Sequence, residues 1–275
     1  MTKNLTNKEK IKVCQNCHLE WRDSLPSDQQ IKKIYTRDYF SQKESLTKGY
    51  PDYDLFLSSF EVYFSDQLRR LNKYLPNRGR LIEVGCGIGV FLHLARKNNY
   101  QVLGIDINKS AKKMAWKRYQ VKVLIGEVGD VSLKEKNYDA VVLFQTIEHI
   151  KYPITFLKNL SRILRPNGIV LITTPNSESL WKKLLKNNWF SYKHQEHLTF
   201  WNEKALKIAL LKSNFKDIDF YSDDIRWYSL KQLITLTIAY GGRKFAYLRY
   251  LRFPNWLDFK IPFPVGSIGL IARNS

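Results

Sequence analysis

The stretch Leu81-Ile-Glu-Val-Gly-Cys-Gly-Ile-Gly-Val90 decides the fold of this 275-residue chain. Residues typical of a buried strand run directly into glycines at every second position, Gly85, Gly87 and Gly89. A helical pattern of apolar residues begins at once with Phe91. A strand that turns into a helix through bare glycines lets a ligand approach the backbone, and it points the unpaired N–H groups of the helix at that ligand. The stretch therefore predicts the first strand and helix of a parallel α/β sheet, with a ligand site at the carboxyl end of the strand.

Strands and helices alternate after this stretch, which favours βαβ units and a Rossmann-like, doubly wound, mostly parallel sheet of about seven strands. Pro166-Asn167-Gly168 predicts a turn that ends one helix and leads into a strand. The expected strands are 80–84, 101–105, 121–125, 138–144, 168–174, 217–221 and 267–272, and the expected helices are 90–98, 109–119, 153–164 and 203–213.

The sequence divides into two predicted regions. Residues 1–75 form an N-terminal region that reads as helical beyond residue 30, most clearly over 54–75, and residues 76–275 form the main domain. Within the main domain, residues 177–200 and 225–265 depart from the alternating pattern, and we expect them to form a cap over the site.

Composition bounds the class of protein. The chain is 44% hydrophobic, has a net charge of +20 and an isoelectric point near 9.7. The first twelve residues are polar and lysine-rich, and no apolar run approaches the ~20 residues of a membrane span, so we expect a cytoplasmic protein. The charge fits either ordinary solvated lysine-rich faces or an acidic partner, namely nucleic acid, an anionic membrane or a phosphorylated substrate.

Two carboxylates accompany the glycine turn. Glu83 lies two residues before Gly85, and Asp106 ends the second predicted strand. A carboxylate at the second position can accept hydrogen bonds from both hydroxyls of a ribose. The spacing is Gly-x-Gly-x-Gly rather than the Gly-x-Gly-x-x-Gly of dinucleotide enzymes, because Val90 occupies the sixth position. An acidic residue at the first strand end suits a cationic amine better than a pyrophosphate, so the pattern predicts an adenine nucleoside with an amino group.

Three segments, 83–89, 104–107 and 138–150, resemble class I S-adenosylmethionine-dependent methyltransferases, in particular the bacterial group that includes the ubiquinone-type O-methyltransferases. Residues 164–176 fit the fifth strand of that family, and the resemblance implies that the last strand runs antiparallel beside it. It also implies S-adenosylmethionine as cofactor. The residues that the resemblance assigns to the cofactor are Glu83 near its amino group, Gly85, Cys86, Gly87 and Gly89 along its methionine part, Asp106 at the ribose, Ile107 and Glu127 at the adenine, and Phe144 and Gln145 as a wall.

Two histidines are the catalytic candidates. His149 follows the fourth predicted strand in Ile147-Glu-His-Ile150, and His197 matches a His-Leu-x-Phe element of the family, whereas His194 has no such match. Each histidine fits either proton transfer or a structural role in its loop. The spacing of His194, Glu196 and His197 is not that of a helical metal-ligand pair, so we predict no metal there.

Cys14-Gln-Asn-Cys17 has the spacing of half a zinc ribbon. A structural zinc needs four ligands, and relatives in the family carry a second Cys-x-x-Cys pair ahead of the same Tyr-x-x-x-Tyr-Phe element, here 35–40. This chain has one pair only, with His18 in place of the usual glycine. We therefore predict a degenerate ribbon without zinc.

Residues 226–260 interleave basic and aromatic side chains, seven lysines and arginines against the single acid Asp258. Such a segment fits a substrate cap with its own aromatic core, the inner face of a membrane, or single-stranded nucleic acid, in that order of preference.

Together these patterns predict an enzyme that transfers a methyl group from S-adenosylmethionine to an oxygen or nitrogen of a small-molecule, glycan or lipid-linked acceptor. The alternatives are an RNA methyltransferase, which only the charge favours, and a protein that binds S-adenosylmethionine without transferring its methyl group.

Overall fold

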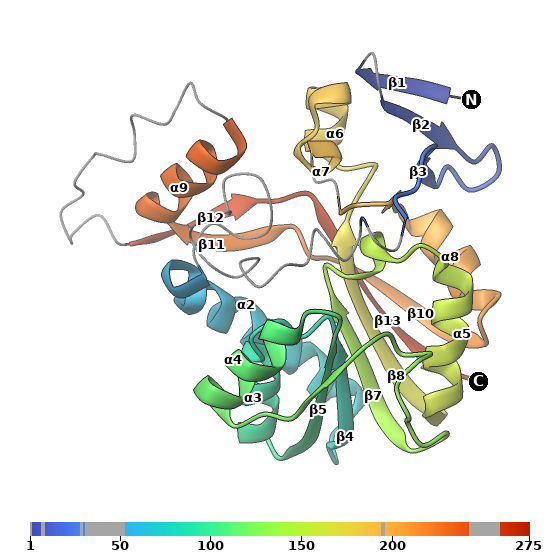
Figure 1. Ribbon diagram of the computed structural model, residues 1–275, viewed down its shortest axis with the longest axis vertical. Helices are drawn as coiled ribbons and strands as arrows, with labels where there is room; N and C mark the ends of the chain where they lie inside the picture. The colour runs from blue at the N-terminus through green and yellow to red at the C-terminus, as the bar shows by residue number, and fades with distance from the viewer. Residues whose placement is uncertain (1, 7–8, 28–29, 31–52, 194–195, 242–258) are drawn as a thin grey trace.

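The computed structural model describes residues 2–6, 9–27, 30, 53–193, 196–241 and 259–275. Its centre is a seven-stranded sheet in the order β10-β13-β8-β7-β4-β5-β6 (Figure 1). The strands from β8 to β6 run parallel, whereas β13 is antiparallel to β8 and β10 is antiparallel to β13. These strands are β4 (Gly79–Val84), β5 (Tyr100–Asp106), β6 (Val123–Ile125), β7 (Tyr138–Phe144), β8 (Leu164–Pro175), β10 (Phe215–Ser222) and β13 (Ser267–Asn274).

This sheet confirms the predicted doubly wound fold and its antiparallel last strand. The predicted turn at Pro166-Asn167-Gly168 is wrong, because these residues lie inside β8. The pairing register with β7 shifts between Tyr138↔Leu164 and Ala140↔Ile169. The three residues therefore form an irregular, unpaired part of a longer strand.

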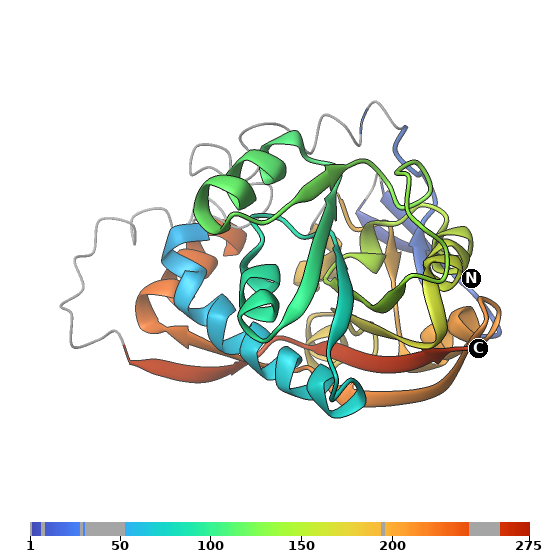
Figure 2. The ribbon, with the colours of Figure 1, turned by 90° about the horizontal axis from the view of Figure 1, so that it is seen from below.

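Helices cover both faces of the sheet, and the pleat of each strand decides which core a residue joins. Leu81 packs with α2 and α3, while its neighbour Ile82 packs with α5 and α8. Figures 1 and 2 show α2, α3 and α4 together on one side of the molecule. The helices are α2 (Tyr53–Tyr74), α3 (Val90–Lys97), α4 (Lys109–Tyr119), α5 (Pro153–Ile163) and α8 (Glu203–Leu211).

A second, four-stranded sheet joins the start of the chain to the region after the main strands, which the sequence did not indicate. It is antiparallel, in the order β1-β2-β3-β9, and Glu20 of β3 lies opposite Phe200 of β9. Its strands are β1 (Thr2–Thr6), β2 (Glu9–Val13), β3 (Glu20–Arg22) and β9 (Thr199–Phe200). The helix predicted most clearly over 54–75 is α2. The rest of the predicted helical region, 31–52, lies outside the described residues.

The described parts of the predicted cap are short elements above the carboxyl ends of the strands. A two-stranded ribbon pairs β11 (Ile225–Ser229) with β12 (Lys260–Pro264), and α9 (Leu230–Gly241) follows β11. The segment 177–200 forms α6 (Leu180–Leu185), a 3-10 turn at Lys186–Asn188 and α7 (Phe190–Lys193). Among the described residues, no helix is long and apolar enough to cross a membrane.

The substitution Gly104→Ala tests how closely the sheet packs under the glycine turn. A Cβ added there would lie 2.6 Å from the Cys86 Sγ and 2.9 Å from Cδ1 of Leu92. Because overpacking a buried site forces its neighbours to shift, we expect Gly104→Ala to lower the free energy of unfolding by about 1–3 kcal/mol. Urea denaturation measures this loss. The matched control is Gly129→Ala, whose Cβ meets only the flexible end of Asn159; equal effects of the two substitutions would contradict the packing argument.

Candidate functional site

The predicted glycine turn connects β4 to α3 as expected. Gly85, Gly87 and Gly89 all have positive φ, 74°, 50° and 83°, a conformation that L side chains rarely adopt. At Gly85 a Cβ would also lie 2.5 Å from Oγ1 of Thr146, so a side chain there would meet the loop after β7. Gly89 is the N-cap of α3, which leaves the first N–H groups of that helix at the end of the turn.

Asp106 fixes the turn from the neighbouring strand. Its carboxylate accepts hydrogen bonds from the Gly87 N–H and the Asn108 N–H, both at 2.8 Å. The side chain is 8% exposed. Burial raises the pKa of Asp106, and the hydrogen bonds from the backbone of Asn108, Gly87 and Ile107 oppose that rise. Asp106 therefore holds the glycine loop against the end of β5 while lying at the site where a ribose was predicted.

Glu83 is buried at the same strand end, with 3% of its surface exposed. Among the described residues, none forms a hydrogen bond with its Oε2. Burial, and then repulsion from Asp106, raises the pKa of Glu83 well above its usual range. A buried carboxyl oxygen without a partner is costly unless a donor reaches it, so this position suits the amino group of a ligand. The residues present therefore fit a nucleoside cofactor that carries an amine.

The other predicted cofactor residues surround this pair. Ile107 is 41% exposed just beyond Asp106, as an apolar surface for a base would be, and Glu127 is exposed after β6. Cys86 turns its side chain into the core against Gly104, so only its backbone faces the turn. Phe144 is buried at the end of β7 in an aromatic group with Phe91, at 4.7 Å between ring centroids.

Gln145 and Tyr63 lie with Phe144 in the wall predicted beside the cofactor. The sequence predicted Gln145 at this wall but not Tyr63. Gln145 donates its backbone N–H to the Thr173 carbonyl and its side-chain amide to Oγ1 of Thr173. The Tyr63 hydroxyl of α2 lies 3.0 Å from the same Oγ1 and donates to Asp223. The Arg226 guanidinium, paired with Asp223, lies 3.7 Å above the Tyr63 ring. No local sequence pattern signals this group, since its members come from α2, β8 and the segment around β11.

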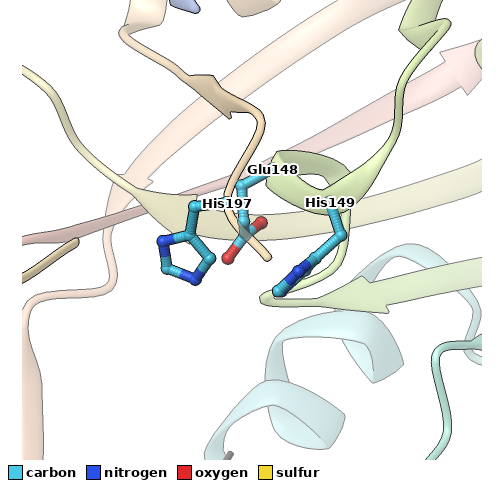
Figure 3. Close-up of side chains that lie close together, drawn as sticks. All are labelled: Glu148, His149 and His197. Atoms are coloured by element: carbon cyan, nitrogen blue, oxygen red, sulfur yellow. The ribbon is translucent and has the colours of Figure 1, made fainter. Parts of the chain in front are cut away.

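A second cluster lies just beyond the end of β7. Glu148 and His149 belong to the 3-10 turn Ile147–His149, and His197 enters from the segment after α7. Figure 3 shows the Glu148 carboxyl between the two imidazole rings, whose centroids are 4.9 Å apart. One ligand atom from each of the three side chains lies within 4.8 Å of the others. The structure thus brings together the two predicted catalytic histidines and adds Glu148.

Backbone carbonyls orient both rings. His149 Nδ1 lies 3.0 Å from the Glu196 carbonyl, and His197 Nδ1 lies 3.0 Å from the Ser191 carbonyl. A carbonyl can only accept, so each neutral ring carries its proton on Nδ1 and its lone pair on Nε2. Buried Arg22 of β3 in turn donates to the carbonyls of His197 (2.8 Å) and Tyr192 (2.7 Å).

Glu148 is the most deeply buried member, at 1% exposure. Its Oε2 accepts a hydrogen bond from Oγ1 of Thr174 at 2.9 Å, while Oε1 has no partner in the part of the chain that the structure describes. Burial raises the pKa of Glu148 to about 8. This carboxyl is therefore mostly protonated at neutral pH. The sequence offered one signal for it, its place directly before His149, which fits a loop-fixing role equally well.

The N-terminal cysteines are free thiols in a turn closed by the Cys14 N–H bond to the Leu19 carbonyl. In the described part of the chain, no third His, Cys, Asp or Glu ligand joins Cys14 and Cys17. The absence of zinc there stays a prediction. His194, considered above as a candidate, lies outside the described residues.

Comparison with known proteins assigns the family. A family model described as "Methyltransferase domain" matches residues 56–219. A probable S-adenosylmethionine-dependent methyltransferase of Mycolicibacterium smegmatis is 33% identical over 97 residues, 35% of this chain and 38% of that protein. A ubiquinone biosynthesis O-methyltransferase of Pelagibacter ubique is 28% identical over 139 residues, 49% of this chain and 55% of that protein.

The chain belongs to this family of methyltransferase domains, whose cofactor is S-adenosylmethionine. The fold agrees: phosphoethanolamine N-methyltransferase 2 of Haemonchus contortus, solved with S-adenosylhomocysteine, superposes with a TM-score of 0.57 at 16% identity, over 93% of this chain and 62% of that one. This chain matches less than two thirds of the length of each of the three proteins compared here.

Asp106→Ala tests the cofactor site. We expect the affinity for S-adenosylhomocysteine to fall about 100-fold or more, because two hydrogen bonds to a charged acceptor are lost, each about 1.5–3 kcal/mol. Isothermal titration calorimetry measures the affinity. His149→Ala and His197→Ala are the controls, which should bind within a few-fold of the original chain. Unchanged affinity in a folded Asp106 variant would contradict the assignment to the ribose.

Glu148→Gln tests the buried carboxyl. The folded pKa of about 8 lies above the usual 4.5, so the folded state keeps a proton that the unfolded state releases. The stabilisation is complete below pH 4.5 and is lost as the pH rises toward 8, by at most about 1.4 kcal/mol per pH unit. Glutamine resembles the protonated acid, so the variant should gain stability relative to the original chain between pH 5 and 8.

Thermal unfolding at several pH values measures this difference. Glu178→Gln, at an exposed carboxyl, controls for the lost charge. A stability difference for Glu148→Gln that stays constant with pH would show that Glu148 is ionised in the folded protein.

Proposed function

We propose that this chain transfers the methyl group of S-adenosylmethionine to an oxygen or nitrogen atom of a small-molecule, glycan or lipid-linked acceptor. The observation that carries the proposal is that the carboxyls and the histidine cluster follow one another along the same edge of the sheet. The carboxyls of Glu83 and Asp106 flank the glycine turn, and the Glu148, His149 and His197 cluster begins three residues after Gln145 on the wall.

The cofactor supplies a methyl group already activated on a sulfonium centre. The protein mainly holds the two reactants in line, which accounts for a large part of the acceleration of such a transfer. In this proposal Asp106 accepts hydrogen bonds from the ribose hydroxyls, Glu83 accepts from the amino group, and Ile107 and Glu127 contact the adenine. The backbone of Gly85 to Gly89 and the wall at Phe144 and Gln145 exclude water from the methionine part.

The acceptor must lose a proton when its oxygen or nitrogen gains the methyl group. The Nε2 lone pairs of His149 and His197 suit this task, since both Nδ1 atoms are turned to carbonyls. The imidazolium formed in this step would favour the ionised form of the neighbouring Glu148 and lower its pKa from about 8. Burial of the cluster strengthens each of these electrostatic effects.

Two other functions remain as alternatives. The net charge of +20 favours an RNA acceptor, and a chain that binds S-adenosylmethionine without transferring it would share the cofactor site. Incubation with labelled S-adenosylmethionine and separated lipid, glycan and RNA extracts tests all three. Label in lipid or glycan supports the proposal; label in RNA alone supports the first alternative, and no label in any fraction supports the second.

The histidines have their own test. We expect His149→Ala and His197→Ala each to lower the rate of methyl transfer about 100-fold or more, the usual contribution of a positioned base, with little change in cofactor affinity. Single-turnover kinetics over a range of pH measures the rate. A rate that recovers at high pH, where the acceptor ionises by itself, supports proton transfer; a rate loss equal at all pH values contradicts it.

A chelator provides the control for that experiment. Two histidines and a carboxylate are also a ligand set that divalent metals accept. We keep the prediction that no metal takes part, so dialysis against EDTA should leave the rate unchanged. Loss of the rate with EDTA, and its return with magnesium or zinc, would assign the cluster to a metal instead.

The acceptor is selected by the cap in this proposal, over 177–200 and 225–265. A peripheral contact of residues 226–260 with the inner face of the cell membrane fits a lipid-linked acceptor, and the basic residues and aromatic side chains of this segment support it. Nucleic acid is the less favoured partner.

A further inference from the structure

The exposed side of α4 carries four lysines and one tryptophan. Their spacing, i, i+3, i+4, i+7 and i+8, places them on one face of the helix, while Ala111 and Ala115 on the opposite face are fully buried. The five exposed residues, called the α4 stripe below, are Lys109, Lys112, Lys113, Trp116 and Lys117.

No acid balances the α4 stripe from within its helix, which contains neither aspartate nor glutamate. Within the part of the chain that the structure describes, none of the four lysines forms an ion pair; the nearby Asp54 is paired with Arg118 instead. Trp116 is 57% exposed, the most exposed of the described tryptophans. A positive face with a tryptophan at its centre is typical of a helix that lies at an anionic lipid surface.

The β11–β12 ribbon adds an apolar surface. On its outer face, Ile225 lies opposite Pro264 and Trp227 lies opposite Pro262, and all four side chains are exposed. Phe259, directly before β12, is exposed as well. The four ribbon residues, called the ribbon face below, carry no charge; Lys260, farther along the same side of β12, donates a hydrogen bond to the Ser58 carbonyl.

The first turns of α2 lie between the two surfaces. Arg118 at the end of α4 forms an ion pair with Asp54 of α2 at 2.6 Å. Phe56, two residues later, contacts Tyr228 of β11, with ring centroids 5.8 Å apart. Helix α4 and the β11–β12 ribbon therefore both contact the first turns of α2, and Figure 1 shows these elements on the same side of the molecule.

From this arrangement we propose that the α4 stripe docks this protein on an anionic membrane. Lysines at the level of the phosphates, a tryptophan at the interface and an uncharged ribbon face beside them match the layers of a lipid surface. RNA would bind the lysines but leave the ribbon face in water, so the lipid surface accounts for more of the observed exposure.

Docking through α4 also orients the cofactor site. Asn108, the N-cap of α4, donates its backbone N–H to Asp106, so the helix begins directly beside the predicted ribose position. A membrane on the α4 stripe would lie close to this edge of the sheet. The inference about the acceptor rests on the proposed methyl transfer: if that function holds, the acceptor is a lipid or a group linked to one.

Co-sedimentation with vesicles tests the docking. We expect the protein to bind vesicles of phosphatidylcholine with about 30% phosphatidylglycerol, and to bind pure phosphatidylcholine at least tenfold more weakly. Lys112→Glu/Lys113→Glu should weaken binding to the anionic vesicles more than tenfold, and Trp116→Ala should weaken it several-fold. The control Lys204→Glu/Lys207→Glu makes the same charge change at exposed positions of α8, on the other face of the sheet, and should stay within twofold.

Three results would overturn the proposal: no binding to anionic vesicles, equal losses in the α4 and α8 variants, or binding to a single-stranded RNA that depends on Lys112 and Lys113 while vesicles are not bound. The thermal shift given by S-adenosylhomocysteine should be the same in every variant, which separates misfolding from lost docking. Because the assay involves no methyl transfer, vesicle binding by a chain that transfers no label would reject the proposed function and leave the docking intact.

Discussion

The structure depends on one buried carboxylate. Asp106 joins the glycine turn to the start of α4 through the N–H groups of Gly87 and Asn108, so the two helices beside the site are fixed by the same side chain. Burial disfavours its charge, and the backbone donors compensate. In the proposed cofactor site, this carboxylate is the acceptor for the ribose hydroxyls. Glu83 lies at the neighbouring strand end, and among the described residues its Oε2 has no hydrogen-bond partner, so a donor on a ligand would satisfy it.

The parts of this arrangement that lie within one strand–turn–helix unit could be predicted from the sequence. Strand periodicity, the glycines and the carboxylates at strand ends are local signals, and they were sufficient for the doubly wound sheet. The strand ends were less certain. The turn expected at Pro166-Asn167-Gly168 is instead part of β8, because pairing with β7 is present on both sides of it, at Leu164 and at Ile169.

The features that sequence reasoning missed are formed by residues far apart in the chain. His197 reaches Glu148 only after the chain has passed through β8, α6 and α7, and nothing near either residue indicates the meeting. Tyr63 and Arg226 are 163 positions apart by their numbers and contact each other across the wall of the site. The short polar strands β1 to β3 have no periodicity strong enough to be recognised. They pair with one another in sequence, and β3 joins them to β9, so the sheet forms only when distant residues meet.

Arg22 connects this N-terminal sheet to the histidines. Its guanidinium holds the carbonyls of Tyr192 and His197, so the strand that carries it fixes the loop from which one imidazole projects. The family match begins only at residue 56. Trimming the protein to residues 56–219 would thus remove the brace of the histidine loop, together with β13, which pairs with β8 in the main sheet.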